Sequence, residues 1–554
     1  MTQQSETEGR ASALARLDEP FDLVVIGAGV NGAATAWDAS LRGIRTLLIE
    51  QDDYGSGTSA WSSRFIHGGL KYLDKLEFGL VREALREREW LLQTAGHLVV
   101  PMRYDMPFYR RSSTPPALIG MGMVLYDVLS YDKSVPRFTV MSKKKILQRL
   151  PGLNPEGLLG GVSYYDAQAV HAERLTVEVV LAAAKAGCVT LNHCAAGALE
   201  VEDGRVKALM VTDRLTGVAY RVETTAIVNA AGPWVDQVLE DMFGGRPGEV
   251  PPRAIGGTKG SHLFVDHFPG APSDVVVREA GTDGRLVFVA PFQGRYMIGS
   301  TDLRFEGDPV EARADDEEYA YLLREANRMF PSANLTAQDV LFHYTGVRPL
   351  PYSPDKPVEE ITRRHLLVDH SANARGLYSI VGGKLTTFRA TGADVADHVA
   401  ALLDVKRPST SRTAMLPGTR SAASGATVSA SNLLSRHSSQ RINQLYGRQA
   451  IEVLGYAKRS GALDVLDVQS GAIRGEIGWA VEHEGAATLT DVLARRLMLS
   501  LSPDLGQSLT EAVAHECARL LGWTGARRAA ELTAYAAFQD RLRNPRVAEH
   551  GVGV

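Results

Sequence analysis

The stretch Phe21–Glu50, FDLVVIGAGVNGAATAWDASLRGIRTLLIE, is the part of this sequence that determines the fold class. It begins with an apolar run typical of a buried strand and passes through the glycine motif Gly27–Gly32 into a helical stretch. A second apolar strand then ends at the acidic residue Glu50. This order of strand, turn, helix, strand and acid within about 30 residues predicts a βαβ unit that binds a dinucleotide.

The three glycines of the motif are expected to serve different purposes. Gly27 permits a tight turn, Gly29 lets a pyrophosphate approach the backbone, and Gly32 lets the helix pack closely on the strand. The helix N-terminus offers N–H donors and a partial positive charge to phosphates. Glu50 can accept hydrogen bonds from ribose hydroxyls and would repel a 2′-phosphate, which disfavours NADP. A chance glycine-rich turn is the alternative.

The composition is that of an ordinary globular protein. The chain has 554 residues, of which 45% are hydrophobic and 22% charged, and at roughly 150 residues per domain this suggests two to four domains. A formal net charge of −4 provides no electrostatic reason to expect nucleic-acid binding. Three cysteines without a C-x-x-C pair predict neither a disulfide framework nor a metal site. We find no signal peptide and no uncharged apolar run of ~18 residues.

Hydrophobic periodicity and turn residues predict the elements that follow. These are helices over Val81–Ala95, Ala172–Ala186 and Asp315–Met329, hairpins around Asp203-Gly204 and Gln293-Gly294, and strand runs ending at Tyr220 and covering Ala226–Asn229.

Further motifs follow Glu50 in a fixed order. They are Thr58–Tyr72 (TSAWSSRFIHGGLKY), Asn229–Val235 (NAAGPWV), Lys259–His262 (KGSH), Ser300–Asp302 (STD), Thr345–Leu350 (TGVRPL) and Gly382–Thr387 (GGKLTT). Together with GAGVNGA, these motifs resemble those of the FAD-dependent glycerol-3-phosphate dehydrogenases, within the D-amino-acid-oxidase-like flavoprotein superfamily. The resemblance extends over about residues 20–395 and is weaker beyond them.

The resemblance implies an α/β fold: an FAD-binding Rossmann-like domain of the glutathione-reductase and D-amino-acid-oxidase type, an antiparallel substrate-binding sheet, and a helical C-terminal domain. The polar residues 1–18 are expected to be disordered. Residues 19–405 are expected to form the FAD-binding and interleaved substrate-binding domain. Residues 406–440, rich in Ser, Thr and Ala, resemble a linker, and residues 441–554 are expected to be helical.

The implied cofactor is FAD. Its expected contacts are Gly27, Gly29, Asn31, Gly32, Glu50, Thr58, Ser59, Ser62, Arg64, His67, Gly68, Ala231, Gly232, Gly382, Gly383, Lys384, Leu385 and Thr386.

Oxidation of a secondary alcohol by a flavin requires a base for the hydroxyl proton and a geometry that brings the hydride to the flavin N5. His67 is the candidate base, because an unperturbed imidazole has a pKa of about 6.5 and can accept a proton near neutrality. It is followed by Gly68-Gly69, where the backbone can approach a ring closely. His262 is the rival base, and for either histidine a packed structural role is the alternative.

The phosphate of the substrate requires cations. The resemblance places Arg348 and Arg363 at the substrate, and arginine's planar fork suits phosphate oxygens. Arg364 leaves the second assignment ambiguous by one residue. The expected catalytic residues are His67, Arg348 and Lys259, and the expected substrate contacts are Lys71, Tyr72, His262, Arg348, Arg363 and Lys384. Lys71 stands where many relatives carry arginine, which leaves its role in doubt.

Two of the motifs have backbone roles by resemblance. The helical run Thr387–Leu403 would place its N-terminus against the flavin pyrimidine ring, where the helix dipole stabilises negative charge. A threonine-capped surface helix is the alternative. The backbone of Asn229–Trp234 would pack against the adenine or pyrophosphate half of FAD, although core packing alone would give a similar sequence.

The segment Met106–Leu129 combines Arg110 and Arg111 with the apolar run Ala117–Leu125. Such a segment suits a bilayer interface, and a helix packed on the core is an equal alternative. Relatives that reduce quinone are peripheral membrane proteins, so we expect a cytoplasmic protein on the inner face of the cell membrane. The oligomeric state stays open, a homodimer included.

The expected reaction is oxidation of sn-glycerol 3-phosphate to dihydroxyacetone phosphate by hydride transfer to FAD, with electrons passed to a membrane quinone. One alternative is an oxygen-reducing, peroxide-forming oxidase of the same fold. An amino-acid or amine oxidase is another, and it predicts a single carboxylate-binding arginine. A flavin-binding protein without turnover is the third.

Overall fold

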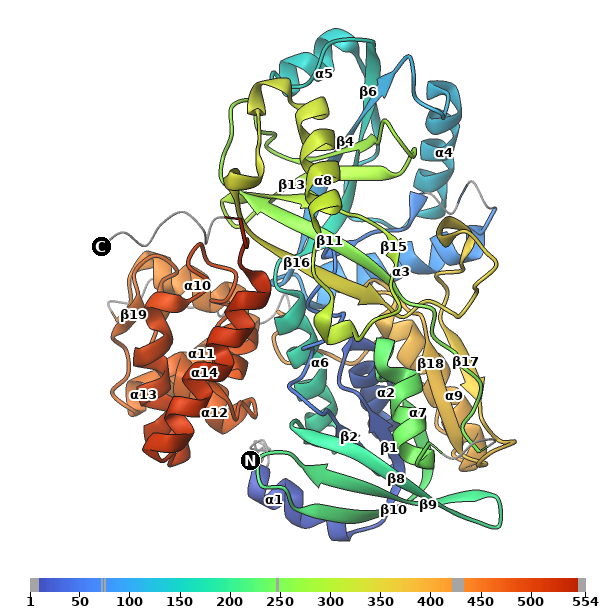
Figure 1. Cartoon of the computed structure of the whole chain (residues 1–554), viewed down its shortest axis with the longest axis vertical. Helices are drawn as coiled ribbons and strands as arrows, with labels where there is room; N and C mark the ends of the chain where they lie inside the picture. The colour runs from blue at the N-terminus through green and yellow to red at the C-terminus, as the bar shows by residue number, and fades with distance from the viewer. Residues whose placement is uncertain (1–8, 71–72, 74–75, 246–248, 421–432, 547–554) are drawn as a thin grey trace.

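The computed structural model describes residues 9–70, 73, 76–245, 249–420 and 433–546. Two sheets lie one above the other, and a group of helices from the C-terminal part of the chain packs beside them (Figure 1). The α/β fold with a helical C-terminal domain, which the sequence predicted, is confirmed.

The first sheet contains the predicted βαβ unit. Its six central strands have the order β17-β18-β10-β1-β2-β7, and all neighbours are parallel except β17 and β18. Side chains on both faces of β1 are buried. Helices α2 (Val30–Leu41), α6 (Ala172–Lys185) and α9 (Phe388–Leu402) cover one of these faces. Burial on both faces explains the continuous apolar sequence of the strand. The strands are β1 (Phe21–Ile26), β2 (Thr46–Ile49), β7 (Val189–Leu191), β8 (Cys194–Glu202), β9 (Arg205–Asp213), β10 (Ala219–Asn229), β17 (Leu366–Asp369) and β18 (Leu377–Val381).

The strand runs that the sequence suggested near Tyr220 and Ala226–Asn229 form the single strand β10. Its first half pairs antiparallel with β9 and its second half pairs parallel with β1. The polar residues in its middle lie where the strand leaves one partner for the other. The predicted turn between β8 and β9 is confirmed, since Asp203 and Gly204 have φ of 50° and 71°, as a type I′ turn requires.

The second sheet is mainly antiparallel and has the order β15-β11-β14-β13-β12-β4-β6-β3, with β16 on β11 and β5 on β6. Helix α8 (Asp316–Met329) packs on it and starts with the capping box of Asp315 and Glu318, so the predicted helix is confirmed. The strands are β3 (Phe65–Ile66), β4 (Val99–Tyr109), β5 (Thr139–Ser142), β6 (Leu158–Ala169), β11 (Thr258–Val265), β12 (Val275–Glu279), β13 (Leu286–Phe292), β14 (Arg295–Gly299), β15 (Leu303–Arg304) and β16 (Val340–Arg348).

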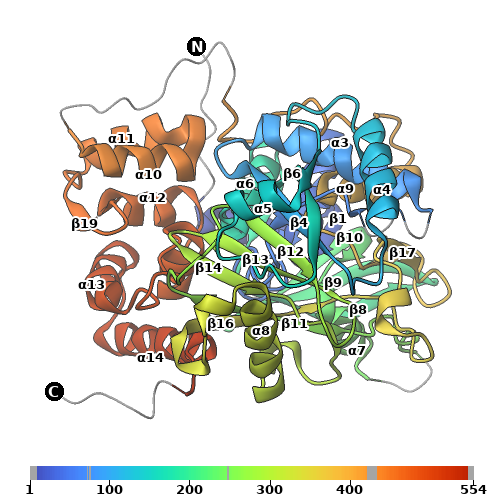
Figure 2. The ribbon, with the colours of Figure 1, turned by 90° about the horizontal axis from the view of Figure 1, so that it is seen from above.

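The C-terminal helices stack along one side of the molecule (Figure 2). They are α10 (Arg436–Tyr446), α11 (Ala450–Arg459), α12 (Gly475–His483), α13 (Thr510–Leu521) and α14 (Gly525–Leu542), with a π-helical turn at Asp491–Arg496. Buried ion pairs join them to the first domain. Arg174 of α6 binds both carboxylate oxygens of Glu484, at 2.5 and 2.6 Å.

The described residues differ from two expectations, that residues 1–18 are disordered and that residues 406–440 form a linker. Residues 10–15 form helix α1, and its Arg10 guanidinium binds Asp213 at 2.6 Å, a partner that composition cannot reveal. Residues 1–8 lie outside the described part. In the expected linker 406–440, Leu416 is buried and the Gly418 amide donates to Glu178 at 2.6 Å. Residues 421–432 also lie outside the described part, and α10 begins at Arg436.

Candidate active site

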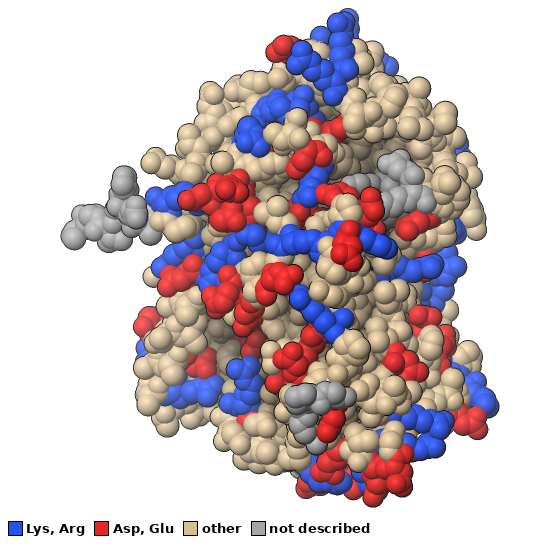
Figure 3. Space-filling model, turned by 45° about the vertical axis from the view of Figure 1, so that its right-hand side comes forward, with Lys and Arg blue, Asp and Glu red and all other residues tan. Residues whose placement is uncertain are grey.

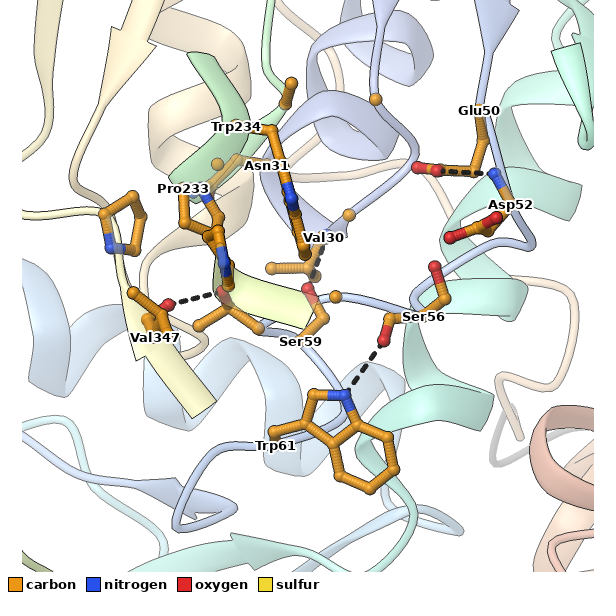
Figure 4. A pocket seen from close by; sticks show the side chains of 18 of the residues that line it. Val30, Asn31, Glu50, Asp52, Ser56, Ser59, Trp61, Pro233, Trp234 and Val347 are labelled. Atoms are coloured by element: carbon orange, nitrogen blue, oxygen red, sulfur yellow. Dashed lines mark hydrogen bonds between the residues drawn. The ribbon is translucent and has the colours of Figure 1, made fainter. Parts of the chain in front are cut away.

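A cavity of about 620 Å³ lies where the carboxyl ends of the parallel strands meet the second sheet. Ile26 ends β1, Glu50 follows β2, Ala230 follows β10 and Gly382 follows β18, and all four residues line this cavity. Ligands of open α/β sheets bind at this edge. Figure 4 shows part of the lining, with side chains from the glycine turn, from the segment after Glu50 and from β16.

The glycine turn has no room for side chains at two positions. Gly27 has φ of 98°, and a Cβ there would lie 2.7 Å from the Ala230 carbonyl oxygen. A Cβ on Gly32 would lie 1.9 Å from the Gly27 carbonyl oxygen. Gly29 is the N-cap of α2 and provides no side-chain cap, so the start of the helix opens into the cavity. The backbone therefore offers N–H donors to an anion, as the sequence predicted.

Glu50 faces the cavity and is held by the backbone. Its carboxylate accepts hydrogen bonds from the amides of Ala28 at 2.8 Å and Asp52 at 3.0 Å, the second of which is visible in Figure 4. Burial raises the pKa of Glu50 to about 7. The acid is thus fixed in position at the end of β2, where a ribose would lie.

The turn before α9 approaches the glycine turn from the opposite side. Gly382 and Gly383 have φ of 82° and 93°, and a Cβ on Gly383 would lie 2.3 Å from Asn31 Nδ2. Asn31 Oδ1 is buried and has no hydrogen-bond partner among the described residues. An unsatisfied acceptor between two glycine-rich turns fits an extended dinucleotide that brings its own donors.

The segment Thr58–His67 runs along the cavity and leads from the first sheet to the second. Thr58 donates to the Val347 carbonyl at 2.7 Å, and Ser59 accepts from the Val30 amide at 3.0 Å. Arg64 has φ of 60° and lines the cavity, but its buried guanidinium binds both carboxylate oxygens of Glu173, at 2.7 and 2.5 Å. This pair anchors the segment that carries His67.

His67 and His262 differ in their surroundings. His67 opens into the cavity, and its amide donates to Thr386 Oγ1 at 3.2 Å. Enclosure by the protein lowers the pKa of the His67 imidazole, and the nearby cations Lys384 and Arg363 act in the same direction. His262 is 1% exposed, lies behind the cavity wall and hydrogen-bonds Ser63 Oγ at 2.8 Å.

Two arginines line the cavity and share one carboxylate. Arg348 Nη1 lies 2.9 Å from Asp302 Oδ1, and Arg363 Nη2 lies 2.6 Å from Asp302 Oδ2. Burial alone would raise the pKa of Asp302, but the two guanidiniums outweigh it and lower that pKa. Arg364 is exposed and is not part of the lining. The motif STD was visible in the sequence, but its aspartate is linked to the arginines only by the fold.

The expected lysines have different positions. Lys384 lines the cavity, and burial together with Arg363 lowers the pKa of its ammonium to about 8. Lys259 lies off the cavity, and its ammonium binds Asp315 at 2.8 Å and Glu318 at 2.7 Å. Lys71 and Tyr72 lie outside the described residues.

Most of the expected residues meet at this cavity. Those that line it are Gly27, Gly29, Asn31, Glu50, Thr58, Ser59, Ser62, Arg64, His67, Ala231, Gly232, Arg348, Arg363, Gly382, Gly383, Lys384, Leu385 and Thr386. Gly32 and Gly68 lie behind it, and Gly68 donates its amide to the Tyr126 hydroxyl at 2.8 Å. Residues of the C-terminal domain also line the cavity, and no sequence motif pointed to them: Thr488, Thr490, Asp491, Arg495, Glu531, Ala534, Phe538 and Arg541.

Two family models match this chain. One is described as FAD dependent oxidoreductase and covers residues 22–389, and the other is described as C-terminal domain of alpha-glycerophosphate oxidase and covers residues 409–528. The glycerol-3-phosphate dehydrogenase of Synechocystis sp. is 43% identical over 516 residues, which cover 91% of this chain and 93% of that protein. Glycerol-3-phosphate dehydrogenase 2 of Mycobacterium bovis is 34% identical, with 93% and 88% covered.

Two solved structures share the fold of this chain, one over nearly all of it and one over about 71% of it. The glycerol-3-phosphate dehydrogenase from Bacillus halodurans, complexed with FAD, superposes with a TM-score of 0.77 at 28% identity and covers 97% of this chain and 98% of its own. The L-alpha-glycerophosphate oxidase from Mycoplasma pneumoniae, with FAD bound, has a TM-score of 0.54 at 18% identity and covers 71% of this chain and 97% of its own, which shows a shared fold.

Proposed function

This chain belongs to the family of FAD-dependent oxidoreductases, and from that premise we propose that it oxidises sn-glycerol 3-phosphate to dihydroxyacetone phosphate. The cofactor is FAD. One arrangement carries the proposal: two arginines joined by Asp302 line the same cavity as His67. A phosphorylated secondary alcohol needs cations for its phosphate and a base for its hydroxyl.

Arg348 and Arg363 bind the phosphate in this proposal. Their guanidinium forks match phosphate oxygens, and Lys384 adds a third cation on the cavity wall. Asp302 positions the arginines, because two guanidiniums this close would otherwise repel each other. Lys259 takes no part, since its charge is satisfied by two carboxylates away from the cavity.

His67 is the proposed base. Its lowered pKa keeps the imidazole neutral near pH 7, so that a ring nitrogen can accept the hydroxyl proton. Bound FAD supplies the acceptor for the hydride. The arginine pair orients the alcohol through the phosphate. The enclosed His262 lacks access to this space.

The contrast with an amino-acid or amine oxidase rests on the number of cations. A carboxylate substrate would be satisfied by a single arginine, whereas Arg348, Arg363 and Lys384 converge here. The three positive charges suit a phosphate dianion. A flavin-binding protein without turnover would have no use for a neutral histidine facing the same space.

A membrane quinone is the proposed electron acceptor, and helix α4 (Pro116–Leu129) is the proposed membrane contact. The helix packs on the core through Met123 and Tyr126. Its opposite face exposes a row of apolar side chains: Leu118 (49%), Met121 (66%), Val124 (54%) and Val128 (61%). The buried face agrees with the alternative of a helix packed on the core, and the exposed apolar face supports the proposed bilayer contact. Within the described residues, every helix is too short or too polar to cross a bilayer.

Charges near α4 support contact with anionic lipid. Arg110 and Arg111 precede the helix and are exposed, and α5 (Lys143–Arg149) carries exposed lysines. Lys and Arg side chains gather at the end of the molecule where α5 lies (Figures 1 and 3). Basic side chains beside an exposed apolar helix face are typical of proteins that lie on the inner leaflet. We therefore propose a peripheral position on the inner face of the cell membrane.

Anaerobic reduction tests the substrate and the acceptor separately. The flavin-loaded protein is mixed with glycerol 3-phosphate without oxygen, and the flavin absorbance is followed; bleaching is expected. A quinone analogue or air is then admitted. Fast recovery with quinone and slow recovery with air supports the dehydrogenase, whereas fast recovery with air and formation of peroxide would make the protein an oxidase. Absence of bleaching would refute the substrate, and with it the roles of the arginine pair.

A further inference from the structure

The C-terminal domain forms one wall of the cofactor cavity. Residues of its π-helical turn, Asp491 and Arg495, and residues of α14, Phe538 and Arg541, line the same space as the glycine turn. The Phe538 ring lies 6.1 Å from the Trp61 ring, so α14 contacts the Thr58–His67 segment directly. A domain that shares the cavity wall can contribute contacts to the cofactor.

Buried ion pairs hold this wall against the βαβ unit. Asp53 lies three positions after Glu50, the acid expected at the ribose, and is fully buried. Both of its carboxylate oxygens accept from Arg496, at 2.7 and 2.9 Å, and Arg495 Nε lies 2.5 Å from it. His193, beside β7, binds Asp491 at 2.8 Å. The domain contact is therefore built on charges next to the nucleotide-binding edge of the sheet.

Arg541 differs from the other cations of this wall. Its half-buried guanidinium lines the cavity and makes no hydrogen bond or ion pair with any residue in the described part of the chain. Burial and the nearby Arg313 lower the pKa of Arg541, and the acids around it, Glu311, Asp52 and Asp308, offset this only in part. A half-buried cation that lines a cavity and has no partner among the described residues fits an anionic ligand.

FAD carries two negative charges on its diphosphate, and the start of α2, which lines the same cavity, offers neutral backbone donors. We propose that the C-terminal domain completes the FAD site and that Arg541 pairs with the diphosphate of the bound cofactor. The C-terminal domain then has a role in retaining FAD. This role is independent of the substrate and of the final electron acceptor.

The test is the affinity of the apoprotein for FAD. FAD is titrated into wild type and variants, and the flavin fluorescence gives Kd without any turnover. Loss of one hydrogen bond to a charged group predicts that Arg541→Ala raises Kd about tenfold to a hundredfold. Arg541→Lys keeps the charge but not the fork, and should raise Kd by about threefold. The affinity of wild type should also fall more steeply with salt than that of Arg541→Ala.

Arg543→Ala is the matched control. Arg543 lies two positions further on, outside the cavity lining, and binds Asp540 at 3.0 Å. Its removal should leave the Kd for FAD unchanged. Thermal unfolding of each apoprotein shows whether the variant is folded, and if Arg541→Ala does not fold, the Kd of Arg541→Lys carries the test, with a value equal to that of wild type counting against the proposal. A folded Arg541→Ala with a Kd within about twofold of wild type would overturn the proposal.

Discussion

Glu173→Gln should destabilise the protein and release FAD at a lower temperature, because Glu173 is the counter-ion of Arg64. Both side chains are buried, at 4% and 0% exposure, and two hydrogen bonds of 2.7 and 2.5 Å join them. Glutamine has nearly the same shape but no charge. It can accept one of the two guanidinium hydrogen bonds, and its NH2 group then faces the other donor.

The burial of the pair sets the magnitude. Breaking a buried pair by removing one partner costs about 3–5 kcal/mol, since the remaining charge is uncompensated. The retained glutamine acceptor favours the lower end, about 3 kcal/mol. Arg64 keeps its bonds to the Ala60 carbonyl at 3.0 Å and the Tyr344 hydroxyl at 3.3 Å, which limits the loss further. With an unfolding entropy of about 2.1 cal/mol/K per residue, 1 kcal/mol corresponds to about 1 °C for a domain of nearly 400 residues, so Tm should fall by about 3–4 °C.

The assay follows thermal unfolding of the flavin-loaded protein at one scan rate, through flavin fluorescence as FAD is released. Arg64 anchors the segment that leads to His67, so FAD release should precede or accompany unfolding. Glu200→Gln is the control, because Glu200 pairs with Arg221 on the surface, where ion pairs contribute little. A Tm for Glu173→Gln within about 1 °C of wild type would refute the reasoning about the buried charge.

Three further outcomes are expected. Arg348→Ala should raise KM for glycerol 3-phosphate by about tenfold or more with a smaller change in kcat, and an unchanged KM would exclude it from phosphate binding. The rate at low substrate should fall only in acid below the ordinary range of imidazole, because the lowered pKa keeps His67 neutral until then. KM should rise above about pH 8 as Lys384 loses its proton, and Lys384→Arg should move that alkaline limb upward. Met121→Glu should weaken binding to anionic vesicles by about tenfold, whereas Val468→Glu, at a site 83% exposed in the C-terminal domain, should not; equal binding of the two would exclude α4 as the contact.

Local sequence predicted much of the cofactor site because its features are local. The glycine turn, the strand before it and Glu50 all lie within one stretch of the chain, and their backbone constraints follow from residue type. The hairpin turn at Asp203-Gly204 is equally local. Hydrophobic pattern and turn chemistry act over a few residues, so these elements could be read before the fold was known.

The functional side chains required the tertiary structure. Only the fold shows that His67 opens into the cavity while His262 lies behind it, and that Arg363 rather than its exposed neighbour Arg364 meets Arg348 on Asp302. The same holds for the packed part of the expected linker. Its Gly418 amide finds Glu178, more than two hundred residues earlier in the chain, and composition carries no trace of such a partner.

The sequence alone predicted a βαβ unit suited to a dinucleotide, and its ordered motifs indicated the flavoprotein family. The tertiary structure alone decided which charges face the cavity, and that α14 and the π-helical turn close one side of it. The physical reason is the distance along the chain between the residues that interact. Backbone conformation depends on neighbours along the chain, whereas the pKa, the pairing and the exposure of a charged side chain depend on groups that only folding brings within a few ångströms.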